Sequence, residues 1–113
     1  MSVYNKKDII GINQEVGESG DFNNESSLDF SLSIIKDKKS WLFELSYIIR
    51  CLLIDHAFRD GNKRTAFILS TLYFDESAVN YDKDKLVNLL HKIAKNNIND
   101  INKIIRELRK CWT

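Results

Sequence analysis

The chain has 113 residues and a net charge of +1, with 43% hydrophobic and 29% charged residues. This size and balance are those of one soluble globular domain, and the small net charge gives no reason to expect general affinity for nucleic acid. Because proline is absent and glycine occurs only four times, a sheet of tight hairpins is excluded and an all-α fold is expected.

The first third of the chain contains one predicted helix and one ambiguous segment. Residues 5 to 16 are expected to form a helix, and residues 17 to 27 are a loop rich in glycine, serine and asparagine. The isoleucines expected on the buried side of the helix are Ile9, Ile10 and Ile12. Residues 26 to 35 fit either a single helix or a mobile, strand-like flap, which would cover about residues 22 to 37.

Two strongly apolar helices are expected in the middle of the chain. The first covers residues 41 to 55, with Ser40 in a suitable place for its N-cap. The second covers residues 62 to 76. Both carry apolar residues nearly all round, a pattern typical of buried helices, so we expect these two helices to lie side by side in the core.

Two amphipathic helices are expected to close the domain. In residues 83 to 96 the apolar residues fall at helical spacing, at Leu86, Leu89, Leu90 and Ile93. In residues 99 to 112 they are Ile101, Ile104, Ile105 and Leu108. His91 is expected to be an ordinary packed or exposed helix residue. The pattern predicts one compact helical bundle over residues 1 to 113.

The cysteines and the hydropathy pattern indicate in which cellular compartment the protein is expected. Cys51 lies in the most apolar stretch and Cys111 is third from the end, so this pair makes neither a disulfide framework nor a zinc site. No basic-then-apolar leader opens the chain, and no apolar run reaches the roughly 18 residues that a membrane span needs. We therefore expect a cytoplasmic protein with no membrane contact.

A polar break of nine residues, 56 to 64, interrupts the apolar stretch LLIDHAFRDGNKRTAFIL. Gly61 precedes the start of the second apolar helix, where unpaired backbone N–H groups and the helix dipole favour anions. Glycine also lets the backbone approach a ligand closely. Lys63 and Arg64 add two cations at an end where the dipole disfavours them, so an external anion is expected there, and phosphate suits it best.

The other residues of the break suit chemistry at that phosphate. Asp60 beside a polyphosphate is a natural Mg²⁺ ligand, because Mg²⁺ typically takes one or two carboxylates together with phosphate oxygens. His56 lies five residues before Gly61 and can fold over the anion site, and histidine is well suited to act as a general base near neutrality. Phe58 is expected to anchor the break in the core.

Each of these residues also has a purely structural explanation. Asp60 alone could cap the following helix, and His56 alone could interact with the C-terminus of the preceding one. Lys63 and Arg64 could form a solvated face. Their coincidence within nine residues, between two helices too apolar for the surface, favours a phosphate-handling site.

Two familiar loops are excluded at this position. A P-loop has glycine five residues before its Gly-Lys pair, whereas His56 stands there and Asn62, not lysine, follows Gly61. An EF-hand would need acidic ligands at the positions of His56 and Phe58.

The break resembles the signature of the Fic/Doc family, commonly written H-x-F-x-[D/E]-[G/A]-N-[G/K]-R. The matching residues are His56, Phe58, Asp60, Gly61, Asn62, Lys63 and Arg64. The resemblance is strongest over residues 45 to 76 and extends loosely over residues 5 to 112. It implies the compact helical bundle of that family, with two buried central helices and a short flap, about residues 22 to 37, that lays a target's backbone beside the site.

The resemblance implies a role for each residue of the motif. His56 would be the catalytic base that takes the proton from a target protein's hydroxyl, and Asp60 would hold Mg²⁺ on the phosphates of ATP. The nucleotide phosphates would be bound by Gly61, Asn62, Lys63 and Arg64. Of these, Arg64 would grip phosphate oxygens, and the Asn62 side chain would join the backbone of residues 61 to 63 in an anion hole.

Lys63 and Phe67 are similar to the Doc branch, for which the resemblance implies phosphoryl transfer from ATP to a Ser/Thr hydroxyl of a translation factor, such as an elongation factor. Members that transfer AMP have glycine at the position of Lys63 and often arginine at that of Phe67, so AMP transfer by the same site is the alternative. Ala57 replaces the usual proline, and the Doc branch often has alanine at the position of Gly61. The resemblance also implies a toxin-type enzyme with a separate antitoxin protein as partner, since the inhibitory Ser/Thr-x-x-x-Glu-Gly/Asn helix of some members is not evident here.

Two other classes of function stay open. An inactive Fic-fold binding module would dock a partner through the flap, although the presence of both His56 and Asp60 favours an enzyme. The last helix could bind nucleic acid through Lys103, Arg106 and Lys110, which share a face, but a solvated helix face is the favoured explanation. We therefore expect no direct contact with nucleic acid.

Overall fold

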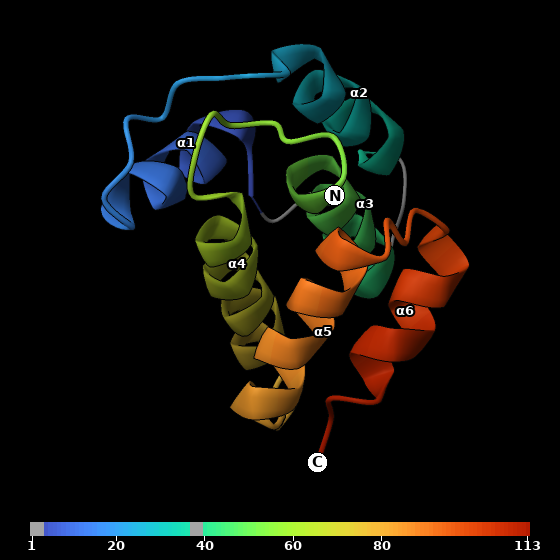
Figure 1. The fold of residues 1–113 in the computed structure, drawn as a ribbon. Coiled ribbons are helices and arrows are strands. Elements are labelled where there is room, and N and C mark those ends of the chain that lie inside the picture. The colour runs from blue at the N-terminus through green and yellow to red at the C-terminus, as the bar shows by residue number, and fades with distance from the viewer. Residues whose placement is uncertain (1–3, 37–39) are drawn as a thin grey trace.

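The computed structural model describes residues 4–36 and 40–113, and these form six α-helices joined by loops (Figure 1). The helices are α1 (Lys6–Glu15), α2 (Glu25–Ile35), α3 (Trp41–Leu53), α4 (Asn62–Glu76), α5 (Lys83–Lys95) and α6 (Ile101–Arg109). The only β-type pairings in this described part are two isolated bridges, Phe22 with Phe58 and Tyr81 with Trp112. The expected all-α fold is confirmed.

Helix α3 is the centre of the bundle and packs against α2, α4, α5 and α6 (Figure 1). Ser40 caps this helix as predicted, because its Oγ accepts a hydrogen bond from the backbone N–H of Phe43. Nine of the thirteen residues of α3 are buried, which confirms it as a buried central helix. Helix α4 packs beside it, but only six of its fifteen residues are buried, so the expectation of a second helix buried on all sides is wrong. Its two ends are charged, and Phe67, Ile68 and Leu72 lie on a partly exposed face.

The amphipathic helix α5 buries the residues expected of it, whereas α1 and α6 bury fewer. Helix α5 buries the four expected residues, Leu86, Leu89, Leu90 and Ile93. In α6, Ile104 and Leu108 are buried, whereas Ile101 and Ile105 are only partly buried. Ile10 of α1 is likewise only partly buried. The helical period turns these flanking isoleucines toward the edge of the core.

Residues 25 to 35 form the regular helix α2, so the strand-like alternative for this segment is wrong. The buried positions are Leu28, Ser31 and Ile35, which recur at helical spacing. A segment in this state cannot offer strand edges to a target's backbone along its length. Residue 37 of the expected flap lies outside the described residues.

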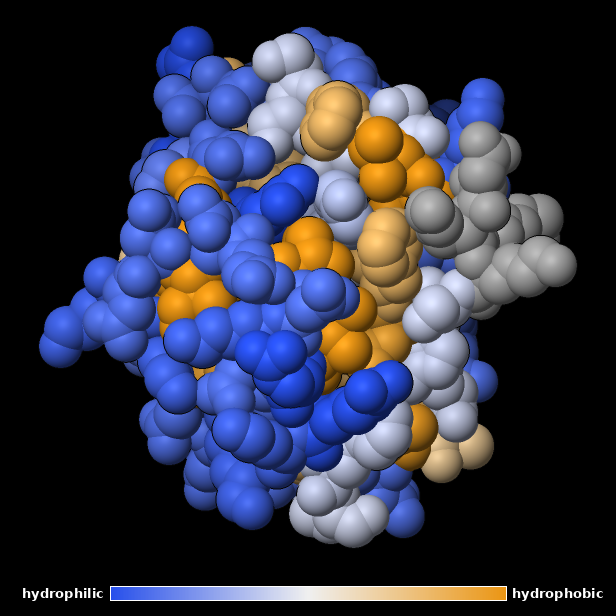
Figure 2. Space-filling view, turned by 90° about the vertical axis from the view of Figure 1, so that its right-hand side faces the viewer, coloured by the Kyte–Doolittle hydropathy of each residue, from blue (hydrophilic) through white to orange (hydrophobic). Residues whose placement is uncertain are grey.

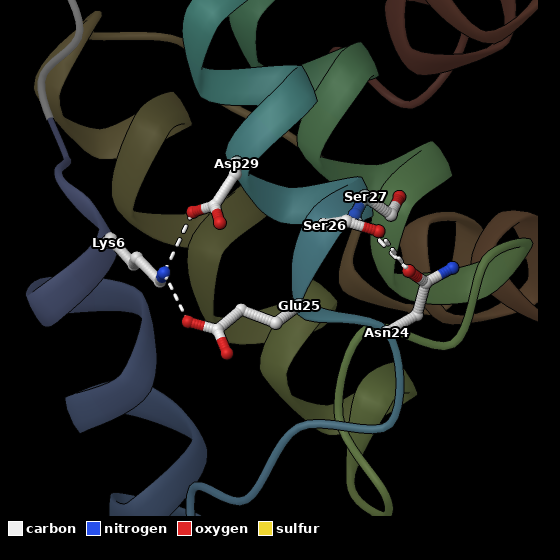
Figure 3. A network of polar contacts seen from close by, with 6 residues as sticks. All are labelled: Lys6, Asn24, Glu25, Ser26, Ser27 and Asp29. Atoms are coloured by element: carbon white, nitrogen blue, oxygen red, sulfur yellow. Dashed lines mark hydrogen bonds and ion pairs between the residues drawn. The ribbon is translucent and has the colours of Figure 1, made fainter.

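Helix α2 is held at its N-terminal end by its own cap and by α1. The side-chain oxygen of Asn24 accepts hydrogen bonds from the Ser27 backbone and the Ser26 hydroxyl (Figure 3). The ammonium group of Lys6 on α1 lies between the carboxylates of Glu25 and Asp29 on α2 (Figure 3). Local capping and a contact between helices therefore both favour the helical state.

The outer surface is mainly polar. Figure 2 faces the side of the molecule on which α2 and α6 lie, and it shows a smaller group of hydrophobic side chains between hydrophilic areas. Among the described residues, the large hydrophobic side chains most exposed to solvent are Phe30 on α2 (55%) and Val87 on α5 (44%). The described helices include none with the length and hydropathy of a membrane span.

Candidate active site

Helix α4 begins differently from the other five helices of the described part. At each of those five, one side chain accepts a hydrogen bond from a backbone N–H of the first turn; the capping residues are Asn5, Asn24, Ser40, Asp82 and Asp100. Gly61 precedes α4 in the left-handed region, at φ 77°, and no side chain caps the helix. Its first turn therefore presents unpaired N–H groups beside Lys63 and Arg64, an arrangement that attracts an anion.

Two residues from outside the motif surround Gly61. A Cβ added at Gly61 would lie 2.5 Å from Cγ of Glu18 and 3.2 Å from Nδ2 of Asn13, so the glycine permits a close contact as well as a positive φ. Asn13 is buried, and its Nδ2 donates to the carbonyl of Asp60 at 3.0 Å and to Oγ1 of Thr65 at 3.1 Å. Asn13 and Glu18 were not predicted as site residues, because no local pattern links them to the distant motif.

Phe58 fills the inside of the motif loop. Its side chain is fully buried, and its ring stacks on that of Phe22 with a centroid distance of 5.0 Å. Asn62 closes the loop over this residue: its Oδ1 accepts from the Phe58 N–H at 3.0 Å, and its Nδ2 donates to the Phe58 carbonyl at 2.9 Å. The side-chain amide of Asn62 thus holds the loop closed through one N–H and its oxygen, and its part in an anion hole stays a prediction.

His56 adopts a strained backbone conformation beyond the end of α3. Its φ of 50° lies in the left-handed region, which costs a non-glycine residue roughly 1–3 kcal/mol. The segment before α2 holds it there, because the Asn23 side chain donates to the His56 carbonyl at 3.0 Å. The backbone N–H groups of Asn23 and Asn24 both donate to the carbonyl of Ala57. The imidazole is exposed and has no hydrogen-bond partner among the described residues, so it can contact a reactant.

The polar motif residues meet in one pocket of about 280 Å³, which we call the anion pocket. Its lining includes His56, Asp60, Gly61, Asn62, Lys63 and Arg64. Phe58 does not line it, because this side chain is buried beneath the loop. In the described structure, the side chains of Asp60 and Arg64 take part in no ion pair. The pocket therefore offers a proton acceptor, a carboxylate, cations and backbone N–H groups at one place.

Among the described residues that line the anion pocket, Asp60 is the one with a carboxylate side chain. The described part contains no group of three or more His, Cys, Asp or Glu side chains placed to hold a metal ion. One carboxylate suits Mg²⁺ when phosphate oxygens and water supply its other ligands. The donor set thus fits a magnesium ion that arrives together with a nucleotide.

No protein-family model matches the chain, and no curated protein matches it. Within the anion pocket, a base candidate (His56) and a metal-ligand candidate (Asp60) adjoin a helix start that attracts anions. These are the groups needed to bind a polyphosphate and to activate a hydroxyl that attacks it.

Proposed function

We propose that this chain is an ATP-dependent, toxin-type transferase that moves a phosphoryl group from ATP to a serine or threonine hydroxyl of a target protein. The observation that carries the proposal is the anion pocket, in which His56 and Asp60 adjoin the uncapped start of α4. The resemblance to the Fic/Doc family adds a translation elongation factor as the class of target. It also adds a cytoplasmic setting and a separate antitoxin as partner.

In the proposed complex, the γ-phosphate of ATP lies at the first turn of α4. Backbone N–H groups and the guanidinium of Arg64 bind its oxygens, since the planar donor fork of arginine matches a phosphate. The Asp60 carboxylate holds the Mg²⁺ that accompanies ATP, and this ion neutralises charge on the phosphates. Lys63 adds a second cation beside the same phosphates.

His56 acts as the general base in this proposal. An imidazole nitrogen takes the proton of the target hydroxyl while the hydroxyl oxygen forms a bond to the γ-phosphorus. The bond from that phosphorus to the bridging oxygen breaks, and ADP leaves with the electron pair. A positioned base typically contributes about 10²- to 10⁴-fold to such a step. The strained backbone of His56 and the hydrogen bond from Asn23 to its carbonyl support the role, because they hold the His56 backbone at the edge of the anion pocket.

The residues at two positions favour phosphoryl transfer over AMP transfer. Lys63 lines the anion pocket at the position where AMP-transferring members of the Fic/Doc family have glycine. Its longer side chain leaves less room for an α-phosphate. Phe67 replaces the second arginine, and its ring lines a mainly apolar pocket instead of binding phosphates. AMP transfer by the same site is the second candidate, because all other residues of the motif suit both reactions.

The test is label transfer from ATP to the proteins of a cell lysate. ATP labelled at the γ-phosphate is compared with ATP labelled at the α-phosphate, and the His56→Ala variant provides the background. Label from the γ-phosphate on a lysate protein, above that background, supports the proposal. Label from the α-phosphate would establish AMP transfer instead. If neither label exceeds the background, the inactive binding module becomes the better account.

A further inference from the structure

One charged side chain of the anion pocket has no part in the proposed reaction. Arg59 lines this pocket together with His56 and Asp60. Its side chain is exposed, and among the described residues it takes part in no ion pair. Because a guanidinium stays charged at every physiological pH, an unpaired one at a pocket is available to an anionic ligand.

The linings of two neighbouring pockets place Arg59 on the same side as His56. A mainly apolar pocket between α1, α4 and α5 shares Lys63 and Arg64 with the anion pocket. His56 and Arg59 line the anion pocket and not this neighbour. With the phosphates of ATP at the first turn of α4, the target hydroxyl has to arrive on the side of His56. Arg59 therefore lies on the side from which the target approaches.

The backbone on both sides of the Arg59 side chain is fixed. Its own N–H donates to the carbonyl of Asp21 at 3.0 Å. The preceding residue, Phe58, is fully buried, and the carbonyl of the next residue, Asp60, accepts from the buried amide of Asn13. These contacts hold the exposed guanidinium at the rim of the anion pocket, so a partner meets it in a defined position.

We infer that Arg59 is a specificity-determining residue that binds a carboxylate of the target protein, on an aspartate or glutamate close in sequence to the accepting serine or threonine. The inference rests on the proposed function, because it defines which hydroxyls that function modifies. The planar donor fork of arginine matches a carboxylate with two parallel hydrogen bonds. The anion pocket has a volume of only about 280 Å³. Since an extended chain advances about 3.3–3.6 Å per residue, the acidic residue lies within about three positions of the acceptor.

The charges around Arg59 favour the target over the nucleotide as its partner. In the proposed complex the phosphates of ATP already have Lys63, Arg64, the N–H groups of α4 and the Mg²⁺ held by Asp60. An acidic segment of the target next to these phosphates is repelled unless a cation offsets the repulsion, and Arg59 supplies that cation. A basic residue at the same place in a target is repelled by Arg59 itself, so this side chain also selects against basic sequences.

The test begins with the proteins of a cell lysate and ATP labelled at the γ-phosphate. Mass spectrometry identifies the labelled protein and its modified residue, and we expect an aspartate or glutamate within the stated distance of that residue. Transfer kinetics then use the purified labelled protein as acceptor and Arg59→Gln as the variant. The matched control is Arg109→Gln, because Arg109 is an exposed arginine of α6 that does not line the anion pocket.

Arg59→Gln should raise the KM for the target by roughly 3- to 30-fold, as expected for a charge-assisted contact that is partly exposed, and should leave kcat and the affinity for ATP unchanged. Arg109→Gln should change none of the three. A target whose acidic residue is replaced by lysine should have a raised KM with the unmodified enzyme, and Arg59→Glu should restore it. A merely structural role for Arg59 excludes this restoration, because a change in the target does not correct a defect in the enzyme's fold.

Three results would overturn the inference while the proposed function stands. The first is an unchanged KM for the target in Arg59→Gln, and the second is a modified residue with no acidic neighbour. The third is a loss of ATP affinity in Arg59→Gln, which would assign the guanidinium to the nucleotide phosphates. If the unmodified protein transfers no γ-label to any lysate protein, the inference fails together with the proposed function.

Discussion

Asn13 donates a hydrogen bond from its buried side-chain amide to the backbone carbonyl of Asp60, at 3.0 Å, and so ties α1 to the motif loop. The same amide donates to Thr65 in α4, and its oxygen accepts the backbone N–H of Gly20. One side chain thus links the loop on both sides of Gly61 with the segment that follows α1. The shape of the anion pocket therefore depends on a residue that does not line it.

We predict that Asn13→Ala lowers the free energy of unfolding by about 1–3 kcal/mol, because buried groups of the loop lose their partner. The affinity for ATP should fall as well, since the loop loses its attachment to α1. Urea unfolding and calorimetry measure the two effects. Gln14→Ala is the matched control, because Gln14 is exposed and, among the described residues, its side chain makes one long hydrogen bond, 3.4 Å, to the carbonyl of Ser19. Equal stability of the two variants would contradict the role given to Asn13.

Gly61→Ala and Gly11→Ala should have opposite effects on stability. At Gly61 the positive φ and the contact with Glu18 oppose a side chain, so we expect a loss of roughly 1–2 kcal/mol. At Gly11, inside α1, an added Cβ meets nothing within 4 Å, so alanine should stabilise the helix by about 0.5–1 kcal/mol. Thermal unfolding of both variants checks this. A gain in stability for Gly61→Ala would show that the loop relaxes freely.

Arg64→Ala should weaken the binding of ATP and of tripolyphosphate by about ten- to a hundredfold, which corresponds to the loss of one charge-assisted hydrogen-bonded contact. Arg109→Ala removes the same type of side chain from an exposed position on α6, away from the pocket, and should leave both affinities unchanged. Calorimetry in low salt gives the comparison. Unchanged binding by the Arg64 variant would argue decisively against a phosphate site at the start of α4.

Most helices were predictable from local signals, and α2 shows why one was not. Its sequence SSLDFSLSII alternates apolar and polar residues from Leu28 to Ile34, as a strand does, but it also fits a helix. In the structure the residues at helical spacing, Leu28, Ser31 and Ile35, are buried. Phe30, which a strand would place on the same side as Leu28, is 55% exposed. The deciding contacts, such as the ion pairs from Lys6, join residues of different helices. A pattern read along one segment cannot show such contacts.

The residues of the candidate site were likewise predictable only in part. The motif residues are close together in sequence, so their common location was predictable, and all of them except the buried Phe58 line one pocket. Asn13, Glu18 and Asn23 reach the loop only through the fold, and nothing in their neighbourhood marks them. His91 is an exposed residue of α5, as expected, although the packing of α5 against α4 also places its Nδ1 3.5 Å from the Nζ of Lys63, which no local pattern predicts.

The ion pairs of Glu107 should make part of the stability depend on pH. Hydrogen bonds from Lys110 and then Lys92 lower the pKa of Glu107 from 4.5 to about 2. Because the folded-state pKa is lowered, this stabilisation is complete above about pH 4.5 and is lost as the pH falls toward 2. Glu107→Gln should therefore melt below the unmodified protein at pH 7, and the gap should close near pH 2. A gap that stays constant in thermal scans over this range would exclude the ion-pair explanation.

The most direct test of the central claim is the rate at which His56→Ala transfers the γ-phosphate of ATP to its target, measured together with its affinity for ATP. We predict that transfer falls by about 10²- to 10⁴-fold while ATP binding is unchanged, because the variant loses the base and keeps the start of α4. His91→Ala, which changes the other histidine of the chain, should leave the rate at saturating ATP unchanged, because His91 does not line the anion pocket. Transfer by His56→Ala at the native rate would contradict the account.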